Sequence, residues 1–238
     1  MDLIVNKEQI KRFLQLVSLT GQNQNKEALF NITKDRIQTL VKSPTNAVGT
    51  KGVLTGSFID IGDLGLDDLV LFNSSVGMIP EEDVKIKINQ NKIVLSTKKS
   101  RASLMLRNAQ YIQNSIKEES FQSHVEKATG NPFVLTAEQI TQLTQTFNLV
   151  KSSTVKITGK DKTITFTFEK NENELETVLD VTDVVEPFTV KVDTFLISIL
   201  AEINDRINIS IKQDVPVILV NYDKKPFLLT YLIAPKVK

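Results

Sequence analysis

Two stretches of the chain place their apolar residues at the spacing of an amphipathic helix. The first follows Asn6, where Ile10, Phe13, Leu14 and Val17 stand at positions i, i+3, i+4 and i+7. This spacing puts the four side chains on one face of a helix and leaves charged residues on the opposite face. The pattern predicts a helix over residues 6–18, capped by Asn6.

The same pattern returns about 130 residues later. Thr136 and Gln139 have the spacing of a capping box, and Ile140, Leu143 and Phe147 form the apolar stripe behind them. Both stretches contain the tripeptide Glu-Gln-Ile, preceded by a short apolar run. The sequence therefore predicts two helices that begin in the same way.

After each helix the apolar residues alternate with polar ones, which is typical of half-buried strands. In the first half this texture covers residues 27–43 and 49–61. In the second half it covers 153–170, interpreted as a hairpin that turns at Gly159–Asp161, and then 173–183.

A second helix follows in each half, predicted over residues 64–74 after a capping Asp63 and over 194–203 after a capping Asp193. Each helix precedes a run of three strands, residues 83–107 and 205–233, so the order of elements repeats.

This repetition indicates a tandem duplication of one α+β unit. The expected division is a first repeat over residues 1–112, an exposed connector over 113–132 and a second repeat over 133–238. The connector is polar, mixed in charge and ends in Gly-Asn-Pro.

Composition narrows the classes of function. The chain has 238 residues, 41% apolar and 24% charged, with a net charge of +1. It lacks cysteine, which excludes disulfides and cysteine-bound metal and fits the cytoplasm. It begins without a signal-peptide pattern, and no apolar run approaches the roughly 20 residues of a membrane span. We expect a cytoplasmic protein without a membrane partner.

Catalytic chemistry finds few candidates. His124 is the single histidine, it lies in the polar connector, and the nine glycines form no phosphate-binding loop. Carboxylates cluster around helix starts and turns, where the helix dipole or solvent favours them. The sequence therefore predicts a protein that is not an enzyme and has neither a cofactor nor a metal site. Acidic residues gather in three groups: Asp60, Asp63, Asp67 and Asp68; Glu81, Glu82 and Asp83; Glu172, Glu174 and Glu176.

The end of the chain resembles the sliding DNA clamps of archaea and eukaryotes. Their closing motif has the form Tyr-Tyr-Leu-Ala-Pro-Lys, and here residues 231–236 read Tyr-Leu-Ile-Ala-Pro-Lys. Residues 214–216, Asp-Val-Pro, also match that family, and the "PFTVKVDTFLISIL" segment resembles the preceding strand and helix. The segment "DLGLDDLVLFNS" and the length of the chain are closer to the clamps of tailed phages, which favours a viral source.

The resemblance implies a DNA clamp fold with two repeats per subunit, helices lining a ring and antiparallel sheets outside. It implies a homotrimer that encircles duplex DNA without sequence specificity, tethers a DNA polymerase and is opened by a clamp loader. The edge strands expected to join subunits are Leu104–Tyr111 and Leu175–Asp180. Work at the site of DNA replication, in the host cytoplasm for a viral protein, is expected.

The resemblance also implies a DNA-lining surface. Relatives carry lysines on the second helix, whereas this chain has Asp67 and Asp68 there. Exposed lysines on any helix are also explained by solvation alone. The residues expected to line the DNA are Lys7, Lys11, Arg12, Lys42 and Lys151.

Clamps recruit partners through a short peptide with an apolar plug, bound beneath the connector and against the C-terminal tail. An apolar patch rimmed by polar loops suits such a peptide. The alternative is that these side chains only join the two repeats. Carried over, the expected pocket residues are Val41, Ile116, Phe121, Val125, Pro216, Tyr231, Leu232, Ala234 and Pro235.

Two other interpretations stay open. One is a monomeric or dimeric accessory factor of the same fold that binds duplex DNA by one basic face. The net charge of +1 speaks against it, because such proteins are usually strongly basic. The other is a clamp-like interaction protein that no longer encircles DNA, which Asp67 and Asp68 would suit.

Overall fold

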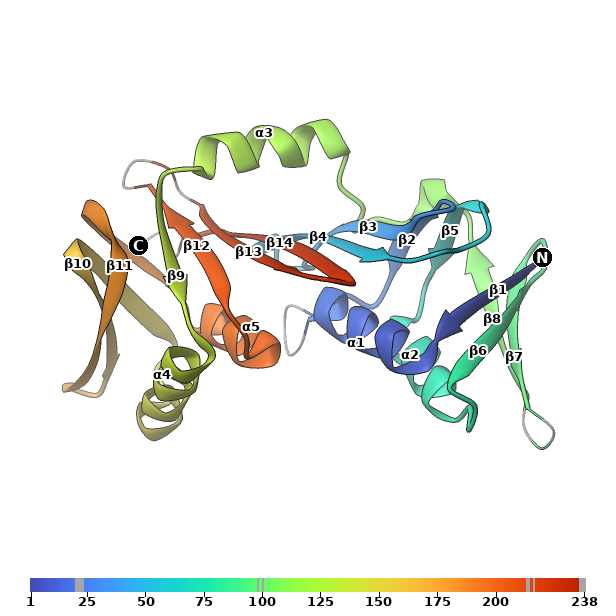
Figure 1. Ribbon diagram of the computed structural model, residues 1–238, viewed down its shortest axis with the longest axis horizontal. Coiled ribbons are helices and arrows are strands. Elements are labelled where there is room, and N and C mark those ends of the chain that lie inside the picture. The colour runs from blue at the N-terminus through green and yellow to red at the C-terminus, as the bar shows by residue number, and fades with distance from the viewer. Residues whose placement is uncertain (20–23, 98, 100, 213–214, 216, 236–238) are drawn as a thin grey trace. The chain divides into compact units, whose positions relative to one another are not determined.

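The computed structural model describes residues 1–19, 24–97, 99, 101–212, 215 and 217–235. The chain divides into two compact units, the first formed by Met1–Glu118 together with Asp223–Leu229, and the second by the rest. Each unit combines helices with antiparallel sheets (Figure 1), so the predicted α+β class is confirmed.

The first unit opens with a strand and a helix, and a second helix follows four more strands. Its elements are β1 (Asp2–Asn6), α1 (Lys7–Ser18), β2 (Ala28–Ile32), β3 (Arg36–Lys42), β4 (Val48–Thr55), β5 (Gly62–Leu66), α2 (Leu69–Gly77), β6 (Asp83–Ile88), β7 (Lys92–Ser96), β8 (Arg101–Arg107) and the 3₁₀ helix η2 (Ala109–Tyr111). The strands pair in the order β1-β6-β7-β8-β5-β2-β3-β4.

The second unit repeats this plan behind an additional helix. Its elements are α3 (Glu118–Ala128), β9 (Asn131–Leu135), α4 (Ala137–Val150), β10 (Thr154–Lys170), β11 (Asn173–Asp193), α5 (Phe195–Ile203), β12 (Ile207–Ile211), β13 (Ile218–Lys224) and β14 (Phe227–Ile233). Strands β14-β13-β12-β9 are neighbours in that order, and β10 pairs with β11 as a separate two-stranded ribbon.

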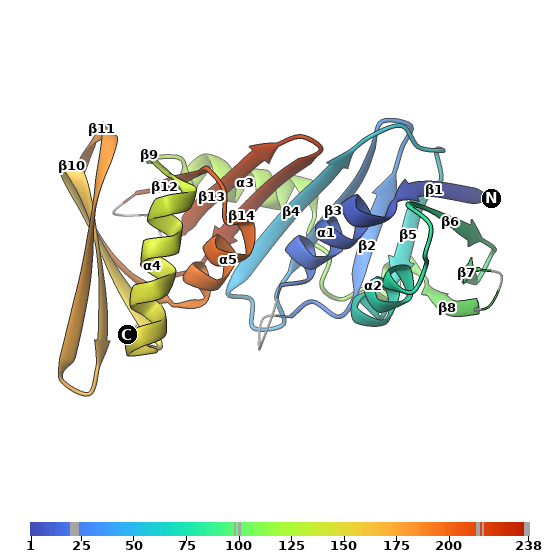
Figure 2. The same ribbon diagram turned by 60° about the horizontal axis from the view of Figure 1, so that its bottom comes forward.

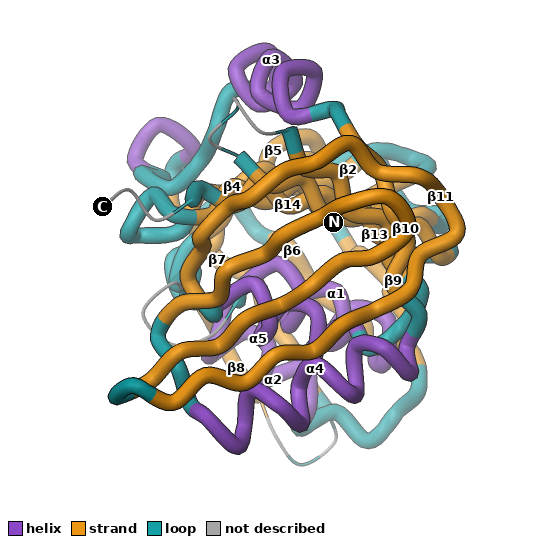
Figure 3. The backbone as a smooth tube through the Cα atoms, turned by 90° about the vertical axis from the view of Figure 1, so that its left-hand side faces the viewer, coloured by secondary structure: helices purple, strands orange, loops and turns teal. Residues whose placement is uncertain are grey.

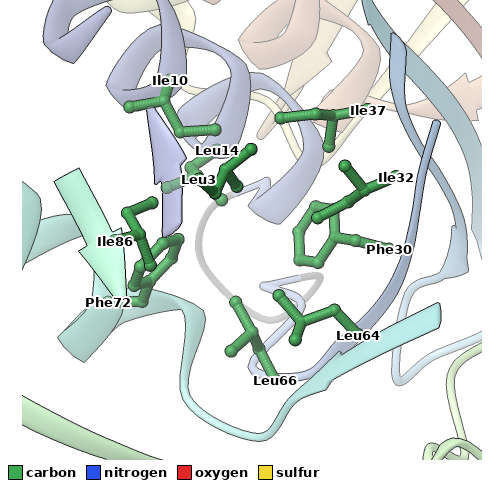
Figure 4. A pocket seen from close by; sticks show the side chains of 10 residues that line it. All are labelled: Leu3, Ile10, Leu14, Phe30, Ile32, Ile37, Leu64, Leu66, Phe72 and Ile86. Carbon is green, nitrogen blue, oxygen red and sulfur yellow. The ribbon is translucent and has the colours of Figure 1, made fainter. Parts of the chain in front are cut away.

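In the first unit, α1 and α2 lie together on one face of the sheet (Figure 2). Apolar side chains from both helices and from five strands meet between these layers (Figure 4). They leave an apolar cavity of about 20 Å³, room for about one water molecule, so this core is closed to ligands. Its lining is Leu3, Ile10, Leu14, Phe30, Ile32, Ile37, Leu64, Leu66, Phe72 and Ile86.

Helix α1 reaches the sheet most closely at Gly52 of β4. A Cβ atom at this position would lie 2.4 Å from Cγ1 of Val17 and 3.0 Å from Cε2 of Phe13. Both side chains are fully buried. The absence of a side chain at Gly52 therefore sets the depth at which α1 packs.

In the second unit, α4 and α5 lie on one face of the β9–β14 sheet, and α3 lies on the opposite face (Figures 1 and 3). Helix α4 also packs on the β10–β11 ribbon, where Phe147 meets Phe168 at 6.2 Å between ring centroids. Thr177 of the ribbon donates a hydrogen bond to Thr146 of α4 at 2.9 Å.

The two units match element by element, because β9, α4, α5 and β12–β14 repeat β1, α1, α2 and β6–β8. The ribbon repeats the four strands between the helices. Its Thr154–Gly159 pairs with Phe188–Asp193 as β2 pairs with β5. Its Thr163–Lys170 pairs with Asn173–Asp180 as β3 pairs with β4. The predicted duplication is therefore visible in the strand pairing.

The helix starts predicted for α1 and α4 are confirmed. The side-chain oxygen of Asn6 accepts a hydrogen bond from the backbone N–H of Gln9 at 3.1 Å. Thr136 and Gln139 form the complete capping box, with N···O distances of 3.3 and 2.9 Å. At α5 the predicted cap is displaced: the N-cap residue is Thr194, without a side-chain capping bond, and Asp193 before it accepts from the N–H of Phe195 at 2.8 Å.

Two sequence predictions are wrong in detail. The segment expected as a helix from residue 64 is strand β5 up to Leu66, and α2 starts only at Leu69, capped by Asp68 instead of Asp63. The turn expected at Gly159–Asp161 is a shift of register inside β10, and the true turn is at Asn171 and Glu172, both with positive φ. One long strand with a shift of register has the same local alternation as two strands joined by a turn.

The range expected as an exposed connector contains helix α3. Phe121 and Ala128 are buried on its inner face, while the rest of the helix is mostly exposed. A polar segment of this composition has too few apolar residues for a clear helical stripe, so the sequence alone favoured a loop.

The capping box makes a prediction about stability. Replacing Thr136 by Ala should lower the free energy of unfolding by about 1 kcal/mol, because the N–H of Gln139 loses its acceptor. Thr136→Ser keeps the hydroxyl acceptor and should lose much less stability. Thr141→Ala, in the exposed middle of α4, should change the free energy of unfolding by no more than about 0.5 kcal/mol. Equal effects of Thr136→Ala and Thr141→Ala in urea unfolding would contradict the capping role.

Candidate DNA-facing and interaction surfaces

Lysines of α1 lie along α2 in the first unit. The ammonium of Lys7 donates to the carbonyl oxygen of Ile79, just beyond the end of α2, at 3.3 Å. The side chain of Lys11 passes Gly77 at the last turn of α2. Positive charge near a helix C-terminus is favourable because of the helix dipole. Lys7 thus has a structural contact, and Lys11 is the better probe of DNA binding.

Helix α2 itself presents an uncharged surface. Its exposed side chains include Val70 and Leu71, and Met78 lies exposed at its C-cap. Asp67 and Asp68 precede the helix, and Asp68 caps it through the N–H of Leu71 at 2.7 Å. The aspartates that depart from the clamp pattern therefore begin the helix, and the positive charge on this surface comes from α1.

The other basic residues expected to line DNA are placed differently. Lys42 belongs to the even-numbered residues of β3, whereas Ile37, Thr39 and Val41 are buried on the side that faces the helices. Lys42 therefore points to the sheet face opposite Lys7, Lys11 and Arg12 and shares no surface with them. In the second unit, Lys151 is the C-cap residue of α4, with a left-handed backbone.

Helix α4 offers hydrogen-bonding groups in place of charge. Its exposed residues include Gln142 and Gln145, and Glu138 is its only charged residue. The counterpart of α1 in the second unit thus has no cationic side chain within the helix.

Residues expected in a peptide pocket fall into both units. In the first, residues 115–116 lie beside β3. Ser115 forms an isolated bridge with Val41, and the N–H of Ile116 donates to the carbonyl oxygen of Leu40. A surface groove of about 260 Å³ opens there, lined by Leu29, Leu40 and Ile116 among polar neighbours. Val41 is fully buried beneath it.

In the second unit the expected pocket residues differ in accessibility. Phe121 and Tyr231 are fully buried and Leu232 is nearly so, while Val125 and Pro235 are half-buried and Ala234 is exposed. Pro235 forms an isolated bridge with Val192. Pro216 lies outside the described residues. Accessible apolar surface at these positions comes from Val125, Ala234 and Pro235.

Several strand segments that the structure describes have a neighbour on one side only, among them the end strands β1 and β9 and both strands of the β10–β11 ribbon. Strand β8 pairs with β7 along its length but with β5 only at Leu106 and Arg107, so Arg101–Met105 has a free edge. In the ribbon, Asn173–Asp180 pairs with β10 alone. Of the edge predicted from Leu104 to Tyr111, the last part is the 3₁₀ helix η2.

A basic face that sequence reasoning missed covers β6, β7 and β8, on the side away from α1 and α2. The alternation in "DVKIKI" buries Val84, Ile86 and Ile88 and leaves the residues between them exposed. This alternation is the sequence feature from which a basic surface on β6 could have been predicted. Register places the following side chains on one face, which we call the basic face: Lys85, Lys87, Lys92, Arg101 and Arg107.

Two acids partly neutralise the basic face. Lys85 pairs with Asp2 at 2.8 Å, and its hydrogen bond holds the pKa of that carboxyl below the ordinary value. Arg107 pairs with Glu27 at 2.7 Å. No ion pair is recorded for Lys87, Lys92 or Arg101 among the described residues, so the net charge of this face is positive.

Comparison with solved structures gives a match over the whole chain. The crystal structure of proliferating cellular nuclear antigen from Entamoeba histolytica superposes with a TM-score of 0.77 and 13% identity, covering 99% of this chain and 98% of that one. The chain has the clamp fold. No family model and no curated protein matches its sequence.

Among the described residues, neither a group of metal ligands nor a helix of membrane-spanning length and hydropathy is found. No group of three or more histidine, cysteine, aspartate or glutamate side chains is placed to hold a metal ion there. His124 is exposed on α3, with Nδ1 2.7 Å from the carbonyl oxygen of Ser120. No helix in the described ranges is long and apolar enough to cross a membrane.

The burial of Phe121 predicts a structural role for a residue first expected to cover a peptide. Phe121→Ala should lower the free energy of unfolding by about 3–5 kcal/mol, because a large buried side chain leaves a cavity. His124→Ala, three residues further on the exposed side of α3, should change it by less than about 0.5 kcal/mol. Similar denaturation midpoints for Phe121→Ala and wild type would show that Phe121 is not part of the core.

Proposed function

We propose that this protein is a sliding DNA clamp, a ring that surrounds duplex DNA and tethers a DNA polymerase. The observation that carries the proposal is the clamp fold over the whole chain, combined with an unpaired segment of β8 in the first unit, Arg101–Met105, and of the ribbon in the second, Asn173–Asp180. A duplicated subunit with two different free edges suits head-to-tail assembly, and such contacts close into rings when the rotation permits.

The chain contains its own template for the contact between subunits. In the first unit, Thr55 at the end of β4 donates its N–H and its hydroxyl to the carbonyl oxygen of Pro226, at 2.8 and 3.1 Å. The segment before β14 therefore covers the end of β4. By the repeat, β8 is the counterpart of β14 and Asn173–Asp180 is the counterpart of β4. Pairing these two between copies would remove both free edges.

A ring holds DNA by topology, so few phosphate contacts are needed. Each phosphate contact adds a salt-dependent term to affinity and would slow sliding. A net charge of +1 and an uncharged α2 fit this mode, with Lys11 and Arg12 of α1 as the proposed contacts. The proposed homotrimer would be opened by a clamp loader and would work at sites of DNA replication in the cytoplasm.

Recruitment of the polymerase is proposed to use a short peptide. The groove beside β3 in the first unit, lined by Leu29, Leu40 and Ile116, supplies apolar surface for it.

The first test is the mass in solution. Light scattering across a range of protein concentrations should give about 80 kDa, three times the 26.7 kDa of one chain. A folded monomer at every concentration and at low salt would contradict a ring that closes by itself.

The second test is retention on DNA. The protein should stay on closed circular duplex DNA and be lost when the circle is cut, because a ring slides off free ends. Lys11→Glu should reduce loading several-fold without changing the mass, whereas Lys26→Glu, exposed before β2, should not. Equal retention on circular and linear DNA would rule out encirclement.

A second candidate is an accessory factor that binds duplex DNA by one face without encircling it. The specific observation in its favour is the basic face on β6–β8, with Lys87, Lys92 and Arg101 unpaired by recorded acids. This candidate predicts retention on both DNA forms and a steep loss of affinity with salt.

A further inference from the structure

The unpaired segments Arg101–Met105 of β8 and Asn173–Asp180 of the ribbon carry opposite charge. On β8, register with β7 places Arg101, Ser103, Met105 and Arg107 on the basic face, and Lys92 lies directly opposite Met105. On the ribbon, the side chains of Glu174, Glu176, Val178 and Asp180 alternate with buried Thr177 and Leu179. We call Glu174, Glu176 and Asp180 the acidic row.

The acidic row is electrostatically unfavourable in a free subunit. Glu174 lies directly opposite Glu169 in the β10–β11 register, and like charges in that position are destabilising. Glu169 has Lys191 at 3.6 Å. No ion pair is recorded for Glu174, Glu176 or Asp180 among the described residues, so a cation from outside the subunit would relieve the repulsion.

Apolar side chains lie exposed beside the same edges. Leu149 at the end of α4 is 78% exposed, and with Leu175 it lines a surface hollow of about 540 Å³ next to the turn of the ribbon. Met105 on β8 is 61% exposed. An interface needs an apolar centre with a polar rim, and both edges offer these parts.

We infer that this pattern is a charge code for assembly, in which the β8 edge of one copy accepts only the ribbon edge of another copy. The inference rests on the proposed ring. Two β8 edges placed together would set arginine against arginine, and two ribbon edges would set glutamate against glutamate. Only the mixed pairing brings opposite charges together.

The code decides between two kinds of oligomer. A symmetric dimer pairs identical patches, whereas a ring needs two different patches that recognise each other. Edges that repel their own kind disfavour the dimer and leave the head-to-tail contact. Within a subunit, β14 is uncharged and Lys51 of β4 is paired with Glu118. Salt should therefore loosen the contacts between copies and leave each subunit folded.

Charge reversal tests the code. Variant one carries Glu174→Lys and Glu176→Lys, variant two carries Lys92→Glu and Arg101→Glu, and variant three combines all four changes. Variants one and two each place like charges across every contact, so the association constant at 50 mM salt should fall at least about tenfold. Variant three exchanges the signs and should regain the oligomer.

Matched controls separate local from general charge effects. Lys34→Glu with Arg36→Glu changes one lysine and one arginine in the exposed turn between β2 and β3, far from either free edge in the strand order. Glu119→Lys with Glu126→Lys does the same for two exposed acids of α3. Both controls should assemble as wild type, and circular dichroism should show all variants folded.

Salt gives the independent readout. Between about 0.1 and 1 M salt the screening length falls from about 10 to 3 Å. Over this range, the association constant of the wild-type oligomer should therefore fall at least about tenfold. The association constant of variant three should depend on salt in the same way. If the association constant does not change with salt, and variants one and two assemble as wild type does, the charge code is wrong. The clamp proposal would not be affected by that result. A chain that stays monomeric even at low salt would instead remove the proposed ring itself.

Discussion

The backbone of an edge strand must find hydrogen-bond partners, and this constraint organises the molecule. Several strand segments have only one neighbour, and two of them, Arg101–Met105 of β8 and Asn173–Asp180 of the ribbon, carry opposite charge. In the first unit, the end of β4 is covered at Thr55 by the segment that leads into β14. The proposed ring would pair the two charged segments between copies and satisfy both.

Charge is distributed according to the two faces of the sheet rather than in one continuous patch. In the first unit, Lys7, Lys11 and Arg12 lie on the helix side beside an uncharged α2, and the basic face lies on the other side of the sheet. In the second unit, α4 is rich in glutamine and threonine, and the ribbon carries the acidic row. For the proposed ring, few fixed phosphate contacts would favour sliding, and opposite charges on β8 and the ribbon would favour assembly.

The local features of the fold could be predicted because short-range physics decides them. Asn6, Thr136 and Gln139 cap helices within three residues, so their role is readable from spacing. The order of elements in both halves followed from hydrophobic period alone. The candidate DNA-facing surface was harder to predict. Lys42 was expected to line DNA together with Lys11, yet the alternation of side chains along β3 places Lys42 on the opposite face of the sheet. One residue of register decides such a question, and local sequence does not fix it.

The sequence by itself determined the duplication, the α+β class and the starts of α1 and α4, because these depend on contacts within one or two turns. Tertiary structure decided the rest. It merged two expected hairpin strands into β10, since Gly159 fits beneath the ring of Phe188 where a Cβ would lie 2.2 Å from Cε1. It turned the expected connector into α3 by burying Phe121, and it brought lysines from β6 and β7 beside Arg101. These features depend on partners distant in sequence, whose identity only the folded chain specifies.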